Sequence, residues 1–161
     1  IDMFNGLDGD GAFAPTRSGA VPVGDLIRLC YSGKYATVDE MMKRAVGDAG
    51  IAAYLGTADM REVNKMIENG DENAKLVKEA FIYQHAKDIG SLSVVMKGKV
   101  DAILLTGGIA YGKDITDAIA SYTEWIAPVV VIPGEREMIA LAQGALRVLN
   151  GEEEAKEYEA W

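Results

Sequence analysis

Two short, nearly all-apolar segments constrain the fold of this chain more than any other feature. They cover residues 99–106 and 128–132, and each has the length of a β-strand. Continuous apolar runs of this kind are typical of strands that are buried on both faces of a parallel sheet. A helical pattern of apolar residues follows each run, over residues 114–126 and 138–149. This order of strand, helix, strand and helix predicts a parallel α/β unit with a right-handed connection.

The remainder of the chain is predicted to be mainly helical. Capping and periodicity signals mark four helices, from Pro22 to about Gly33, from Thr37 to about Val46, from Asp59 to about Asn69, and from Glu72 to about Lys97. Residues 1–20 are glycine-rich, so we expect a short strand end followed by a long loop. The acidic residues 151–161 are expected to form a surface helix that is docked by Trp161.

Several side chains with possible chemistry are assigned to packing instead. Cys30 lies in the apolar stripe of its helix, and we expect it in the core. Met41, Met42 and Met66 have helical spacing and are expected to fill the core. His85, the only histidine, lies beside the apolar stripe of the longest helix. We therefore expect a buried or half-buried packing residue there and not a catalytic base.

The composition is that of one globular domain without broad positive charge. The 161 residues are 49% hydrophobic and 25% charged, and the net charge is −9. Because this charge repels nucleic acids and anionic membranes, we expect neither as a partner. No apolar run reaches the about 18 residues that span a bilayer, and the first 20 residues lack the apolar region of a signal peptide. With a single cysteine as well, the chain is expected in the cytoplasm.

The most specific candidate site follows the first apolar segment. Gly107, Gly108 and Ile109 come where a buried strand is expected to turn into a helix. In open α/β sheets ligands bind beyond the carboxyl ends of strands, and a helix N-terminus there attracts negative charge. A nucleotide would suit this position, although a tight turn needs glycines for its dihedral angles alone. The GxGxxG fingerprint and the Walker lysine motif are both absent.

Arg17 is a second candidate, because it lies between small, turn-forming residues in a glycine-rich loop. Phosphoryl transfer needs a positioned cation on the oxygens of the transferring group, and a fixed guanidinium can supply it. A solvated loop arginine is the alternative interpretation.

Two segments with acidic residues are further candidates. Asp59 could bind a ribose hydroxyl and Arg61 could stack on a base, although Asp59 is also a good helix cap. Glu135 and Glu137 follow the second apolar segment, where carboxylates could hold magnesium. Acidic residues in the first turn of a helix are also ordinary partners of the helix dipole.

Taken together, several segments resemble the acetate, propionate and butyrate kinases, and butyrate kinases most of all. The resemblance runs the length of the chain, through GLDGDGAFAPTRSG, LIRLCYSGKY, AYLGTADMREV, VDAILLTGGIAYGK and APVVVIPGEREMIALAQGALRVLNGEEEAKEY. It places the chain in the actin-like superfamily of two-lobed ATPases. It implies a ribonuclease-H-like C-terminal lobe that is helix-rich, with a short and mainly parallel sheet that lacks its first strands.

The resemblance also implies an activity. The expected reaction is ATP plus butanoate to ADP plus butanoyl phosphate, with magnesium. Residues 1–161 would be the nucleotide-binding lobe. The N-terminal lobe, with its phosphate-binding turn, and the second phosphate loop HLGGG are not in these residues, so this piece alone is expected to be inactive. The alternatives are an acetate or propionate kinase, or a non-catalytic nucleotide-binding or oligomer-forming fragment. Kinases of this kind are at least dimers, so a homo-oligomer is expected.

Site residues carry over from the resemblance position by position. Arg17 in TRSG matches the catalytic arginine of these kinases. The residues that match adenosine-contacting segments are Asp59, Met60, Arg61, Gly107, Gly108 and Ile109. Glu137, or else Glu135, matches the carboxylate that helps to hold magnesium.

Overall fold

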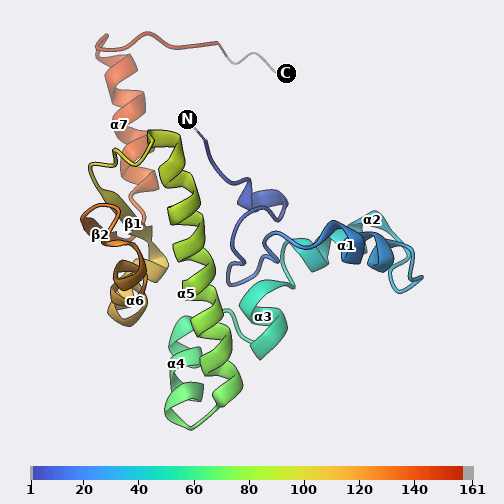
Figure 1. Ribbon diagram of the computed structural model, residues 1–161. Helices are drawn as coiled ribbons and strands as arrows, with labels where there is room; N and C mark the ends of the chain where they lie inside the picture. Colours follow the sequence, from blue (N-terminus) through green and yellow to red (C-terminus); the bar gives the residue numbers. More distant parts are fainter. Residues whose placement is uncertain (1, 158–161) are drawn as a thin grey trace.

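The computed structural model describes residues 2–157 (Figure 1). The α-helices are α1 Val23–Cys30, α2 Val38–Ala45, α3 Gly50–Leu55, α4 Met60–Glu68, α5 Glu72–Leu92, α6 Lys113–Thr123 and α7 Glu137–Leu149. Short 3₁₀ helices are η1 Gly6–Asp8, η2 Ser93–Met96 and η3 Gly108–Tyr111, and the strands are β1 Ile103–Gly107 and β2 Val129–Pro133. The four helices predicted before residue 98, the two that follow the apolar segments and the parallel strand–helix–strand unit are therefore present.

The long helix α5 organises the core. It begins at Asp71, whose side chain accepts a hydrogen bond from the backbone N–H of Ala74. Helices α3, α4 and α6 pack on α5, as Figure 1 shows for α4 and α6 on its flank. The buried apolar side chains that meet there are Ile51, Val63, Ala74, Val77, Phe81, Ile82, Ile115 and Ile119. Phe13 of the N-terminal loop also reaches this core, with its ring centroid 5.8 Å from that of Phe81.

The sheet has two parallel strands, with Ile103 paired to Val129 and Thr106 paired to Ile132. Only one of its faces is covered. Ile103 is buried, whereas Leu104 on the opposite face is 62% exposed, and Val130 and Ile132 of β2 are exposed beside it. The prediction that both strands are buried on two faces is therefore wrong. The exposure of Leu104, Val130 and Ile132 shows that this second face is left largely uncovered within residues 2–157.

Local capping signals are confirmed by the structure. The Thr37 hydroxyl accepts from the backbone N–H of Glu40 at the start of α2, and Asp59 accepts from that of Arg61 at the start of α4. Helix α4 ends at Asn69 and is followed by Gly70, which has a φ of 88°. These helix boundaries were predictable because they depend on neighbours along the chain.

Other predictions were wrong where they needed a distant partner. Residues 2–5 form no strand, since no other strand lies beside them to complete a ladder. Cys30 is exposed and Met42 is 44% exposed, because α1 and α2 contain no buried residue. Met66, by contrast, packs against the core as expected. The C-terminal segment is a turn and then irregular over 151–157, not a helix, and Trp161 lies outside the described residues.

None of the helices in the described part of the chain has both the length and the apolar character that a membrane span requires.

Candidate functional site

Two predicted site segments that are distant in the sequence line one cavity of about 550 Å³. Asp59, Met60 and Arg61 contribute from the start of α4, and Gly108 and Ile109 contribute from η3. The other lining residues are Ala58, Asn64, Tyr111, Gly112, Asp114 and Ile115. We call this space the α4–η3 cavity. Its walls combine carboxylates, a guanidinium, apolar side chains and glycine backbone.

The turn after β1 determines the shape of one wall. Gly107 has φ 86° and ψ −179°, a conformation that residues with a side chain rarely adopt. It exchanges two backbone hydrogen bonds with Gly134, of 3.0 and 3.3 Å, so the turn is held to the end of β2. Gly107 itself does not line the cavity. Its role in the structure is to turn the chain so that Gly108 and Ile109 do.

Asp59 and Arg61 form a tight pair at the edge of this cavity. The Asp59 carboxylate accepts from the Arg61 backbone N–H and from Nε, both at 2.9 Å, and from Nη2 at 2.6 Å. The hydrogen bond from the Arg61 side chain, with that from its backbone, lowers the pKa of Asp59 to about 2. Asp59 is therefore ionised at any physiological pH. It caps α4 and still presents a carboxylate to the cavity, so the two interpretations of this residue are compatible.

A second carboxylate, that of Asp114, faces the same cavity from the first turn of α6. Burial raises its pKa, but hydrogen bonds and charge attraction from Lys78, with smaller hydrogen bonds from Ile115 and Asn64, outweigh that effect and lower the pKa. Two ionised carboxylates suit the hydroxyl groups of a sugar better than they suit a phosphate.

The loop that carries Arg17 is fixed by backbone hydrogen bonds. The carbonyl oxygens of residues 14–16 accept from backbone N–H groups in residues 47–52 at 2.8–3.3 Å. Gly50, with φ 60°, lies against this loop so closely that a Cβ atom would be 1.9 Å from the Ala14 oxygen. Arg17 is half-buried, and within residues 2–157 its guanidinium forms no salt bridge. The loop therefore holds a cation in a defined place, apart from the α4–η3 cavity.

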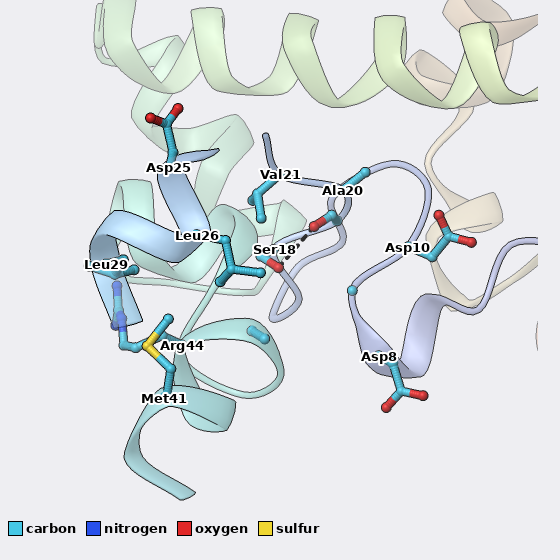
Figure 2. A pocket seen from close by; sticks show the side chains of 13 residues that line it. Asp8, Asp10, Ser18, Ala20, Val21, Asp25, Leu26, Leu29, Met41 and Arg44 are labelled. Carbon is cyan, nitrogen blue, oxygen red and sulfur yellow. Dashed lines mark hydrogen bonds between the residues drawn. The ribbon is translucent and has the colours of Figure 1, made fainter. Parts of the chain in front are cut away.

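Immediately after Arg17, Ser18 and Gly19 line a different cavity of about 410 Å³ (Figure 2). Its walls come from the N-terminal loop and from α1 and α2, with Leu26 and Met41 among the apolar residues. The Ser18 hydroxyl donates to the Gly19 carbonyl at 3.0 Å, the dashed line in Figure 2. The sequence predicted the glycine-rich loop. It did not predict this cavity, because the cavity forms only where α1 and α2 lie against that loop.

The two predicted magnesium ligands lie elsewhere. Glu135 follows β2, Glu137 is the first residue of α7, both are exposed, and neither lines the α4–η3 cavity. Within residues 2–157 no group of three or more His, Cys, Asp or Glu side chains could hold a metal ion. His85 is half-buried with its Nδ1 2.8 Å from the Phe81 carbonyl oxygen, as expected of a packing residue.

Sequence reasoning missed four residues of the cavity and its surroundings: Asn64, Lys78, Tyr111 and Asp114. Asp114 carried a weak signal, because it is an acidic residue in the first turn of a predicted helix. Asn64 and Lys78 lie on helical surfaces and carried none, since only the packing of α4 and α6 on α5 brings them to Asp114.

The fold is shared with kinases that act on short-chain acids. The chain matches the structure of acetate kinase from Porphyromonas gingivalis with a TM-score of 0.77 and 22% identity, over 87% of this chain and 41% of that one. It matches a propionate kinase from Francisella tularensis with a TM-score of 0.68 and 26% identity, over 81% of this chain and 39% of that one. The expected fold class is therefore confirmed.

Sequence comparison identifies the family. The profile of the Acetokinase family matches residues 6–124, and the chain belongs to this family. Butyrate kinase 2 of Clostridium acetobutylicum is 56% identical over 158 residues, which are 98% of this chain and 44% of that protein. The resemblance to butyrate kinases is confirmed by this match. The chain spans less than half the length of this relative.

Proposed function

We propose that the chain is the nucleotide-binding lobe of a butyrate kinase, which transfers a phosphoryl group between ATP and butanoate. One observation carries the proposal: the two segments expected to contact adenosine, 59–61 and 107–109, meet at one cavity through Asp59–Arg61 and Gly108–Ile109. The 56% identity to Butyrate kinase 2 supports butanoate over acetate or propionate as the acid.

The chemistry of the α4–η3 cavity suits the nucleoside end of ATP. Met60, Ile109 and Ile115 offer apolar contacts for a base, and Asp59 or Asp114 can accept hydrogen bonds from ribose hydroxyls. Arg61 is 88% exposed along its side chain, so its guanidinium face is free to stack on the base. Gly108, which lines the cavity, lets the chain approach the ligand without a Cβ atom in the way.

Arg17 is proposed as the catalytic cation. In the forward reaction a carboxylate oxygen attacks the γ-phosphorus, a new P–O bond forms, and the bond to the ADP oxygen breaks. Charge on the transferring phosphoryl oxygens is stabilised by a fixed guanidinium, and the pinned loop of residues 14–18 supplies one. No proton transfer is required, which agrees with the assignment of His85 to packing.

Mg²⁺ fits this chain only if the substrate and water supply some of its ligands. Mg²⁺ is commonly bound by one or two carboxylates together with substrate phosphates and water. The described residues contain no complete set of magnesium ligands. Glu137, or else Glu135, would supply one carboxylate, and the phosphates of the nucleotide and water would supply the other ligands. The ion would neutralise charge on the phosphates of the bound nucleotide.

The test is acyl phosphate formation by the intact protein, measured with hydroxylamine in the presence of ATP and magnesium. Butanoate should be turned over faster than acetate or propionate. Arg17→Ala should lower turnover by about 10³-fold while ADP still binds. The matched control is Arg28→Ala, which removes an exposed arginine paired only to Asp25 and should leave turnover unchanged.

Other outcomes would change the proposal in defined ways. Faster turnover of acetate or propionate would make the protein an acetate or propionate kinase. Nucleotide binding without acyl phosphate formation would favour a non-catalytic module. An Arg17→Ala protein with normal turnover would remove Arg17 from the mechanism.

The proposal extends to the organisation of the molecule. It assigns residues 1–161 to the C-terminal lobe of a two-lobed kinase, with an N-terminal lobe and a second copy of the protein as partners, and a cytoplasmic location. Light scattering on the intact protein tests the homo-oligomer.

A further inference from the structure

A half-buried lysine connects the two walls of the α4–η3 cavity. Lys78 of α5 forms an ion pair with Asp114 of α6, and its Nζ also donates to the Asn64 side-chain oxygen of α4 at 2.6 Å. The Asn64 amide donates in turn to Asp114 at 3.2 Å. Asn64 and Asp114 both line the cavity, whereas Lys78 lies behind them. We call these three residues the Lys78 network.

The Lys78 network lies where the two walls of the cavity, α4 and α6, are joined through a third helix, α5. Helices α4 and α6 each pack on α5 and lie along the same flank of it (Figure 1). The cavity opens between them, so its width depends on how α4 and α6 are held relative to each other. Among the side-chain hydrogen bonds of residues 2–157, the Asn64–Asp114 bond is the one that joins α4 directly to α6.

Burial distinguishes Lys78 from the other lysines near the cavity. Its side chain is 14% exposed, compared with 82% for Lys113, which pairs with Asp117 one turn along α6. A solvated pair of the second kind contributes little to structure, because water competes for both charges. The partly buried Lys78 ammonium donates to two acceptors, the side chains of Asn64 and Asp114. It holds both in place, because an acceptor that moved away would lose its hydrogen bond to the ammonium.

We propose that Lys78 is a positioning residue for nucleotide binding, and that it sets the separation of the two cavity walls by holding Asn64 and Asp114 together. This inference rests on the proposed function, because it assigns the nucleotide to the α4–η3 cavity. Lys78 does not touch the ligand and acts through its two partners.

The experiment compares nucleotide binding and turnover in the intact protein. Lys78→Met keeps the length of the side chain but removes the charge. It should raise the ADP dissociation constant, measured by calorimetry, and the KM for ATP by about tenfold. Turnover at saturating ATP and the KM for the carboxylate should change by less than about twofold, because the loss is in ground-state binding of one substrate.

Three further variants separate positioning from a general loss of structure. Lys78→Arg can pair with both acceptors and should restore ADP affinity to within about threefold of the wild type. Lys113→Met removes the exposed pair with Asp117 on α6, the helix of Asp114, and should leave affinity unchanged. In an Asp114→Asn background, Lys78→Met should change affinity by less than about twofold, because a residue that acts through Asp114 has little left to act on.

Several results would overturn the inference. They are unchanged ADP affinity in a folded Lys78→Met protein, a fall in turnover without a change in KM, and full additivity with Asp114→Asn. If Lys78→Met does not fold, Asn64→Ala is used instead, and unchanged affinity in that variant would count against the network. If the wild-type protein binds no ADP at all, the proposed function fails, which is a different result from equal binding by wild type and variant.

Discussion

The region around α5 and the region formed by α1 and α2 both consist of helices with apolar residues at helical spacing, but the two regions differ in burial. Each region has a helix with a side-chain cap, since Thr37 caps α2 and Asp71 caps α5. Helix α5 buries Ala74, Val77 and Phe81, with others, whereas α1 and α2 bury none of their residues. Helix α7 resembles α1 and α2 in this respect.

The difference shows that an apolar stripe predicts a helix but not its partner. Ile27 and Leu26 have the spacing of core residues, yet they are 54% and 40% exposed. The stripe of α5 is covered because α3, α4 and α6 pack on it. The α4–η3 cavity lies in the packed region, while Arg17 lies on the loop that joins the packed region to α1.

The largest expected effect is a difference in stability between the two regions. Phe81→Ala removes a side chain that is 2% exposed and should lower the free energy of unfolding by about 3–5 kcal/mol. Ile27→Ala, on α1, should change it by less than about 0.5 kcal/mol. Urea denaturation of the intact protein measures both. Equal losses would show that α1 is covered as thoroughly as α5 and would remove the contrast.

A slightly smaller effect is expected at the junction of the two regions. Gly50→Ala places a Cβ atom against the Ala14 carbonyl and should cost about 2–4 kcal/mol, from the strain of a positive φ and from the overlap. Gly56 has a similar φ of 75° but no atom within 4 Å of such a Cβ. Gly56→Ala should therefore cost only about 1–2 kcal/mol. If the two variants were equally stable, close packing of the Arg17 loop on Gly50 would be excluded.

The smallest expected effect is a change in the pKa of Asp59, at the edge of the α4–η3 cavity. Asp59, with its pKa of about 2, is stabilising above its unfolded pKa of about 3.9, and this contribution is lost as the pH falls through about 2. Arg61→Ala should return the pKa of Asp59 toward about 3.9, because the hydrogen bond from the Arg61 side chain is the largest cause of the shift. An NMR titration of the carboxyl carbon measures it. Arg28→Ala is the control, and an unshifted pKa in Arg61→Ala would show that the pair does not form in solution.

Features that depend on neighbouring residues were predictable from the sequence. The cap at Asp59, the glycine after α4 and the parallel order of β1 and β2 all followed from local patterns. The open face of the sheet at Leu104 and the exposure of Cys30 were not, because burial is decided by elements that are distant in the sequence.

The residues of the candidate site also fall into two groups, those that the sequence could identify and those that it could not. Asp59 and Gly108 could be named from motifs, but it is the packing of α4 and α6 on α5 that brings them to one cavity. Lys78 and Asn64 could not be named, since nothing in the spacing of an isolated lysine on α5 points to Asp114 on α6.

The central claim is that nucleotide binds between α4 and η3. Hydrogen–deuterium exchange of the intact protein, with and without saturating ADP, tests it most directly. ADP should slow exchange of backbone amides in residues 58–64 and 108–115 together, with little change in α1 and α2. Protection of neither segment, or of the cavity beside α1 and α2 instead, would contradict the claim.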